Sequence, residues 1–189
     1  MRRRFCDTKK CQKEAPQIKI LALDQARRGG WSIFDAQSKA LLSHGTFSFP
    51  AKFEFSKAVY EITRIAAELI ENNGIGMVFI EDTQFQKNAN SFKKLAQLQG
   101  ALINLCEGLG VPCACVPPVR WQAFCGARGR SAREVKSGEA AQVRKATKLL
   151  SVQFVKQRFC IDTDNDNLAD AVCIGWYAVN HLAGGSENA

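Results

Sequence analysis

The chain has 189 residues, 46% of them hydrophobic, and a formal net charge of +8. This length fits one ordinary domain with a sizeable core, and the hydrophobic content excludes a largely disordered chain. No apolar run approaches the ~20 residues of a membrane span, and the polar, basic start lacks the apolar segment of a secretory signal. We therefore expect a cytoplasmic protein without a membrane partner.

Positive charge is concentrated in two regions of the sequence. Residues 1–19 carry seven Lys or Arg against two acids, and residues 120–158 carry ten against two. Because neutralising phosphates dominates the affinity of proteins for nucleic acids, two basic regions favour a polyanionic partner. A solvated basic surface with a basic tail is the alternative.

The eight cysteines are scattered through segments with a core-like pattern, and the chain has only two histidines. Reduced thiols that pack as small hydrophobic residues fit this distribution better than a disulfide scaffold does. A structural zinc site needs four Cys or His ligands at short spacings. The sequence therefore predicts neither a disulfide framework nor a zinc centre.

The folded domain is predicted to span residues 17–183, between a flexible basic arm at 1–16 and a disordered tail at 184–189. Five short segments have the composition of strands, and the first three are expected to form an antiparallel meander: 18–23, 30–34, 41–47, 77–80 and 113–116. Gly29 and Gly30 are expected to make the tight turn between the first two strands. Apolar spacing predicts helices at 55–69, 88–107, 119–124, 139–159 and from about 167 onward.

Two acids follow predicted strands: Asp24 after the first and Glu81 after the fourth. If these strands are parallel neighbours, their carboxyl ends meet at one edge of the sheet, where α/β proteins place much of their chemistry. Adjacent strands lie ~4.8 Å apart, so the two carboxylates could share a cation. Carboxylates that close repel each other unless one is protonated or a metal lies between them.

The last informative segment reads IDTDNDNLADAVCIGWYAVNHL and contains Asp162, Asp164, Asp166 and Asp170. On a structural reading, Asn167 is the N-cap of the final helix and Asp170 completes a capping box. Capping needs one acid near the helix start, so it does not account for the other three. A functional role for some of these acids therefore stays open.

Four motifs occur in an order that resembles a known nuclease family: LALDQARRGGWSIF, FIEDTQFQKNANSFKKLAQLQGAL, VPPVRWQAFCG and DNDNLADAVCIGWYA. Together they are similar to the RNase H fold of metal-dependent nucleases. More narrowly, they resemble the RuvC family of Holliday junction resolvases, especially the variants of phages and prophages. The resemblance covers about residues 17–183 and implies a bacterial or phage-infected cytoplasm.

The resemblance implies an α/β RNase H-like fold, with a five-stranded mixed sheet (an antiparallel meander plus parallel strands) and helices on both faces. It also implies a homodimer that cuts four-way DNA junctions by symmetric nicks with 5′-phosphate ends. Each site would hold two Mg²⁺ ions, with Mn²⁺ as a substitute and no small-molecule cofactor.

The resemblance gives the metal-ligand roles to Asp24, Glu81 and Asp170. Bacterial members place Asp or His three residues before the final Asp, where this chain has Asn167. Asp166 is the expected substitute, because positions i and i+4 share a helix face. The carbonyl oxygen of Asn167 is the other candidate for the fourth ligand.

The family uses the loop after Glu81 to reach the junction centre, which makes Phe85 a candidate to stack on an opened base. A core phenylalanine beneath the loop is the alternative. The candidate phosphate contacts are polar or basic residues of this loop and of the basic region: Lys87, Asn88, Arg128, Arg130, Lys136 and Lys145. Lys136 or Lys145 is also expected to help neutralise the transition state.

Two alternatives to a junction resolvase remain at this point. The first is a nuclease of the same kind that cuts branched DNA more broadly. The second is a module that binds junctions without cutting them, which Asn167 in place of an acid would suit. The presence of Asp24, Glu81 and Asp170 favours an active enzyme.

Overall fold

The structure is a computed structural model that describes residues 18–85, 88–128 and 140–181, with the backbone alone at 140–145 and 147. The predicted arm at 1–16 and tail at 184–189 lie outside these residues. Among the helices described, none is both long and apolar enough to cross a membrane.

Five strands form one mixed sheet in the order β3-β2-β1-β4-β5. The strands are β1 (Lys19–Asp24), β2 (Arg28–Asp35), β3 (Leu41–Ser48), β4 (Ile75–Glu81) and β5 (Cys113–Val116). The first three pair antiparallel, whereas β1 with β4 and β4 with β5 pair in parallel. This arrangement confirms the predicted mixed sheet and makes β1 and β4 parallel neighbours.

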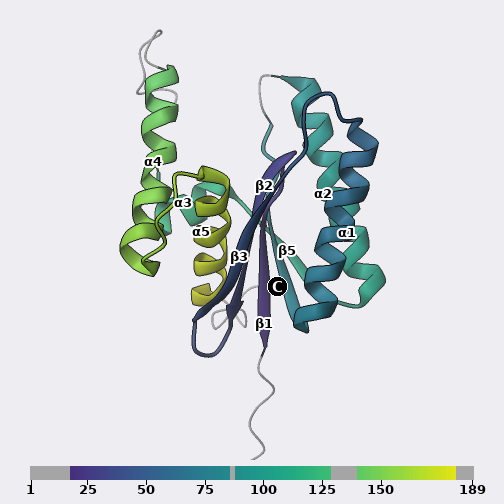
Figure 1. Cartoon of the computed structure of the whole chain (residues 1–189), viewed down its shortest axis with the longest axis horizontal. Coiled ribbons are helices and arrows are strands. Elements are labelled where there is room, and N and C mark those ends of the chain that lie inside the picture. The colour runs from purple at the N-terminus through teal and green to yellow at the C-terminus, as the bar shows by residue number, and fades with distance from the viewer. Residues whose placement is uncertain (1–17, 86–87, 129–139, 182–189) are drawn as a thin grey trace, which may run out of the picture.

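The helices cover both faces of the sheet (Figure 1). They are α1 (Phe55–Asn73), α2 (Ala89–Leu109), α3 (Pro118–Phe124), α4 (Ala140–Phe159) and α5 (Asp166–His181). Helices α1 and α2 lie on one side, and α3, α4 and α5 lie on the other (Figure 1). Each side has its own hydrophobic core, and the sheet separates the two.

Alternation along the strands decides which face each acid occupies. In β1, Ile20 and Ala22 belong to the core under α5, whereas Leu21 and Leu23 belong to the core under α1 and α2. Because successive side chains of a strand point to opposite faces, Asp24 lies on the α5 face. By the same rule Glu81 follows Phe79 onto that face.

The prediction that Gly29 and Gly30 form a turn is wrong, because both glycines lie inside β2. Their role is close approach between backbones. A Cβ atom at Gly30 would lie 2.2 Å from the backbone oxygen of Asn167, and one at Gly29 would lie 2.3 Å from that of Asp24. The absence of side chains therefore allows the start of α5 to lie directly against the sheet, beside the strand that ends in Asp24.

The prediction that Asn167 caps the last helix is also wrong. Helix α5 begins at Asp166, and the side-chain oxygen of Asn165 accepts hydrogen bonds from the backbone N–H groups of Asn167 and Leu168 at 3.1 and 3.2 Å. Asn165 is therefore the N-cap. A capping box with Asp170 is therefore also excluded, because Asp170 lies in the second turn of the helix, too far from the N-cap Asn165.

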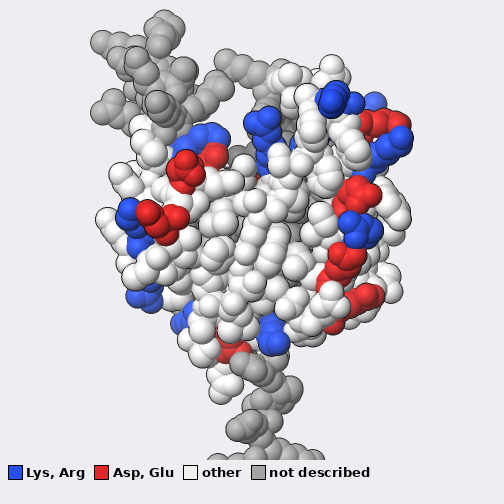
Figure 2. All heavy atoms as spheres, in the orientation of Figure 1, with Lys and Arg blue, Asp and Glu red and all other residues white. Residues whose placement is uncertain are grey.

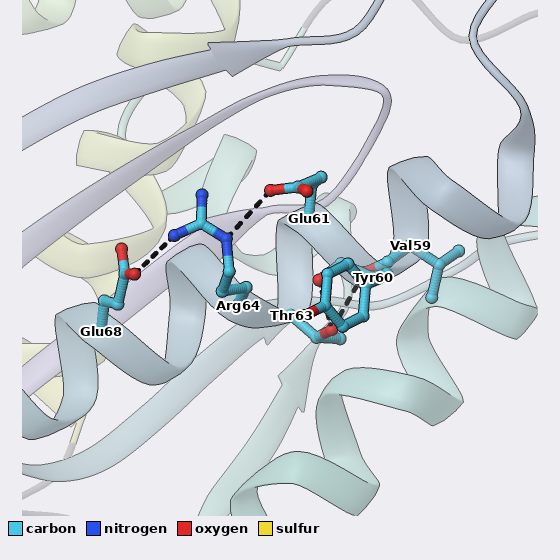
Figure 3. Close-up of polar contacts among 6 residues, drawn as sticks. All are labelled: Val59, Tyr60, Glu61, Thr63, Arg64 and Glu68. Carbon is cyan, nitrogen blue, oxygen red and sulfur yellow. Dashed lines mark hydrogen bonds and ion pairs between the residues drawn. The ribbon is translucent and has the colours of Figure 1, made fainter.

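Charged residues of both signs alternate over α1, along the right margin of Figure 2, whereas the surface over β3 in the centre of that view is largely uncharged. On α1, Arg64 forms ion pairs with Glu61 and Glu68, one helical turn to either side (Figure 3). Exposed pairs of this kind contribute little to stability. Because positive charge is balanced there, the outer face of α1 is a poor surface for a polyanion.

Candidate active site

Three acids meet on the α5 face at the carboxyl ends of β1 and β4. Asp24 ends β1, Glu81 ends β4, and Asp170 projects from the second turn of α5. Asp24 is only 8% exposed, and its carboxyl group shares a hydrogen bond with that of Glu81. We call Asp24, Glu81 and Asp170 the carboxylate cluster.

Burial raises the pKa of every member of the cluster, and repulsion from neighbouring acids raises the pKa of Asp24 and Glu81 further. The pKa of Asp24 lies well above its ordinary value, because of burial first and then the charges of Glu81 and Asp170. Burial and the charge of Asp170 raise the pKa of Glu81 to about 7. Burial raises the pKa of Asp170 to about 6. Perturbed carboxylates gathered at one place are typical of functional sites.

Neutral donors hold two of the three carboxylates in place. The indole Nε1 of Trp121, on α3, donates a hydrogen bond to Glu81 Oε1 at 3.1 Å. The hydroxyl of Ser151, on α4, lies 3.2 Å from the backbone oxygen of Lys148, to which it can donate, and its hydrogen bonding to Asp170 lowers the pKa of that acid. Trp121 and Ser151 are 2% and 1% exposed, so both donors come from packed positions.

A polar network fixes the backbone just beyond Glu81. The Gln25 side-chain amide donates to the backbone oxygen of Glu81 at 2.9 Å and to the Thr83 hydroxyl at 3.0 Å. Gln99, on α2, accepts from the backbone N–H of Thr83 at 3.0 Å and donates to Asp82 at 3.1 Å. The network joins the ends of β1 and β4 to α2. Together with Trp121 on the α5 face, it holds the end of the strand that presents Glu81 from both faces of the sheet.

Asp166 lies one turn before Asp170 on α5 and has a different partner. Its carboxylate forms an ion pair with Lys148 of α4. The charge of Lys148 also lowers the pKa of Asp24 and of Asp170. Lys148 is therefore the cation nearest the carboxylate cluster among the residues whose electrostatic effects on it are resolved.

A pocket of about 390 Å³ opens beside Glu81. Its wall includes Gln25, Thr83, Phe85 and, from α3, Val119 and Gln122. Phe85 is 79% exposed, and its ring contacts that of Phe92 edge-on at 5.5 Å. The alternative that Phe85 is a core residue is therefore wrong, and an exposed aromatic ring stands next to one of the acids.

The donor set of the cluster suits a hard divalent cation. Mg²⁺ and Mn²⁺ prefer carboxylate oxygens. The pKa values of the three acids are raised chiefly by burial, which in Asp24 and Asp170 outweighs the opposing charge of Lys148. In the described part of the chain, no three His, Cys, Asp or Glu side chains are arranged as a closed ion site. Binding a cation would therefore require the carboxylates to turn, beginning with the Asp24–Glu81 hydrogen bond.

For each of the other residues predicted to contact phosphates, the structure gives only a position, or the residue lies outside the described part of the chain. Asn88 is the N-cap of α2, where its side-chain oxygen accepts from the N–H groups of Asn90 and Ser91. Arg128 is exposed beyond α3. Lys87, Arg130 and Lys136 lie outside the described residues, and Lys145 belongs to α4 with its side chain outside the description.

The sequence reasoning missed several residues around the cluster. It did not single out Gln25, Ser151 or Lys148, and it used Trp121 only as part of a motif. A glutamine directly after the strand-end acid is a signal that could have drawn attention to Gln25. For Lys148 the only signal was its place one helical turn after Lys145 in a basic helix.

No family model matches the sequence. The crossover junction endodeoxyribonuclease RuvC of Halorhodospira halophila is 27% identical over 115 residues, which are 60% of this chain and 69% of that protein. Over that region the chain is similar to RuvC. The structure of Thermus thermophilus RuvC in complex with a Holliday junction substrate has a TM-score of 0.67 at 13% identity and covers 89% of this chain and 98% of its own.

The RuvC fold is shared more widely. The structure of Fowlpox virus resolvase with its substrate Holliday junction DNA has a TM-score of 0.54 at 15% identity, over 87% of this chain and 99% of that one. At such identities the similarity establishes the fold. The RNase H-like α/β architecture expected from the sequence motifs is therefore confirmed.

Proposed function

We propose that the chain is a divalent-metal-dependent endonuclease that resolves four-way DNA junctions. The observation that carries the proposal is the carboxylate cluster, with Asp24 buried and Glu81 and Asp170 partly exposed, at the carboxyl ends of β1 and β4. The chain is also similar to a crossover junction endodeoxyribonuclease. Two relatives by fold are described with Holliday junction DNA. The cluster supplies a site for the chemistry, and these relatives supply the class of substrate.

Asp24, Glu81 and Asp170 would hold Mg²⁺, or Mn²⁺ in its place, with Asp166 or Asn167 as a further ligand. Ions bound there would supply the activation of water and the stabilisation of the leaving 3′ oxygen that hydrolysis of a phosphodiester to a 5′-phosphate end requires. Lys148 places a positive charge beside the cluster, where negative charge develops on the phosphate. Trp121, Ser151 and Gln25 keep the acids and the strand end in place.

The surface around the pocket suits a DNA branch point. Phe85 offers an exposed ring to an unstacked base, and stacking on an aromatic ring does not depend on base identity. The basic residues predicted to contact phosphates, Lys87, Arg128, Arg130, Lys136 and Lys145, remain our proposal for the backbone contacts. Symmetric nicks would follow if two copies of the chain each present one site, so we also propose a homodimer.

Cleavage of matched substrates would test this function. The purified chain is incubated with Mg²⁺ and end-labelled four-way junction, Y-fork, duplex or RNA–DNA hybrid of the same sequence, and the nicks are read on a denaturing gel. The account expects paired symmetric nicks in the junction and little cutting of the duplex. Equal cutting of forks and junctions would indicate a broader debranching nuclease, and tight junction binding without any cutting would contradict the enzyme.

A further inference from the structure

The side chain of Glu81 accepts a hydrogen bond from a neutral donor. That donor is the indole N–H of Trp121, which lies 3.1 Å from Glu81 Oε1 and 40 positions away in the sequence. An indole N–H donates and cannot accept, and it does not ionise near neutral pH. The contact therefore holds the carboxylate without neutralising the charge that a cation would need.

The donor is fixed by its own packing. Trp121 is 2% exposed and belongs to the core under α5, together with Cys125 of the segment that follows α3. The Cys125 thiol lies 3.6 Å from the backbone oxygen of Cys173, which joins this segment to α5. A large ring in such a core has little freedom, so the direction of its N–H bond is set before any ligand arrives.

The same residue is held at its backbone as well. Gln25 donates to the Glu81 backbone oxygen at 2.9 Å. The other two acids have different supports: Asp24 shares a hydrogen bond with Glu81 itself, and Asp170 is held by Ser151. Glu has the longest side chain of the three acids and the most rotatable bonds to order when an ion binds.

We propose that Trp121 is the positioning residue of the metal site: its indole N–H engages Oε1 of Glu81 and so preorders the carboxylate to present its other oxygen to the cation. This inference rests on the proposed function only for the identity of the ion. When a residue that hydrogen bonds to a metal ligand is lost, the metal affinity or the activity typically falls by about 10-fold to 100-fold. Loss of the Trp121 N–H should lower the metal affinity more than the maximal cleavage rate, because Trp121 orients a metal ligand and does not bind the metal itself.

The sharpest test removes the N–H and keeps the shape. In the full chain, Trp121 is replaced by 3-benzothienylalanine, in which sulfur takes the place of the indole N–H. The matched control places the same residue at Trp176, whose ring contacts Arg158 at 4.5 Å and Phe159 at 5.6 Å. Trp121→Phe is a second variant that removes the donor with ordinary chemistry.

Mn²⁺ binding is measured by titration calorimetry without DNA, and junction cleavage is measured across a Mg²⁺ series. The variant at 121 should bind Mn²⁺ about 10-fold or more weakly and need correspondingly more Mg²⁺ for half-maximal cleavage, with the maximal rate changed less. The control at 176 should match the wild type in both. Wild-type Mn²⁺ affinity in the variant at 121 would overturn the proposal. Because calorimetry needs no cleavage, the inference can fail or survive independently of the nuclease activity.

Discussion

Asp24 and Glu81 end two adjacent parallel strands, and their carboxyl groups share a hydrogen bond. Such a bond needs one of the two acids to be protonated, because two carboxylates cannot donate to each other. Burial and the nearby Asp170 favour the protonated form of Asp24. In the metal-free protein, the pair therefore favours binding a proton at the place where the proposed function puts a cation.

The raised pKa values predict how the stability of the metal-free protein depends on pH. The folded state binds the proton of Glu81 more tightly than the unfolded state does, since the pKa rises from 4.5 to about 7. The contribution of Glu81 to stability is therefore fully present below the pKa of the unfolded state, 4.5, and is lost as pH rises to the folded-state pKa of about 7. Thermal melts in EDTA between pH 4 and 8 should show the melting temperature falling across about this range.

Glu81→Gln should then stabilise the metal-free protein at pH 8, by on the order of 2 kcal/mol, because the buried charge is gone and an acceptor for Trp121 remains. Exposed Glu71, on α1, offers the control Glu71→Gln, which should change little. Mg²⁺ should raise the melting temperature of the wild type and not that of Glu81→Gln. If Glu81→Gln were less stable than the wild type at pH 8, this would contradict the claim that the ionised Glu81 destabilises the metal-free protein.

Lys148→Met should slow cleavage of a junction by about 10²-fold at saturating Mg²⁺, because it removes the positive charge beside Asp24 and Asp170. Lys156→Met is the matched control: Lys156 lies on the same helix and pairs with exposed Asp162 at 2.5 Å. Single-turnover rates measure the effect. Equal losses in both variants would mean that general positive charge on α4, rather than the place of Lys148, matters.

The fourth metal ligand can be decided between two neighbours. Asp166→Asn should raise the Mg²⁺ concentration for half-maximal cleavage by about 10-fold, more than Asn167→Ala does. The loss of Asp166 removes a candidate ligand and also frees Lys148 from its ion pair, leaving it to compete with the cation. If the Mg²⁺ requirement rises more in Asn167→Ala than in Asp166→Asn, the fourth metal ligand is the side-chain amide of Asn167.

Phe85→Ala should weaken junction binding about tenfold in Ca²⁺ and leave the melting temperature unchanged, because the ring is 79% exposed and free to stack on a base. Tyr60, a 65% exposed aromatic residue on α1, gives the control Tyr60→Ala, for which no loss is expected. Gel shifts with junction and duplex measure both. A fall in melting temperature without a change in binding would assign Phe85 to loop packing.

The sequence was sufficient for the architecture and for the centre of the site, for a physical reason. Strand and helix periodicity fix which segments form the sheet, and the carboxyl ends of parallel strands meet, so Asp24 and Glu81 could be paired before any coordinates. Asp170 required the family resemblance. The capping residue was misassigned by two positions, since Asn165 and Asn167 are equally good caps and only the path of the chain decides between them.

The residues that support the acids could not be read in the same way. Trp121 has the sequence signature of a core residue, and no local pattern says which acceptor its N–H will meet across 40 positions. Lys148 is one of several cations on α4, and the packing of α4 on α5 selects it. Gly30 looked like a turn residue, because close approach to Asn167 leaves no mark in the neighbouring sequence.

The most direct test of the central claim is the single-turnover rate of four-way junction cleavage by the wild type and Asp24→Asn across a Mg²⁺ series. We expect the wild-type rate to saturate with Mg²⁺ and to vanish in EDTA. Asp24→Asn should bind the junction as well as the wild type does and cut it at least about 10²-fold more slowly. Cleavage by the wild type in EDTA, or wild-type cleavage by Asp24→Asn, would contradict a metal-dependent site at the carboxylate cluster.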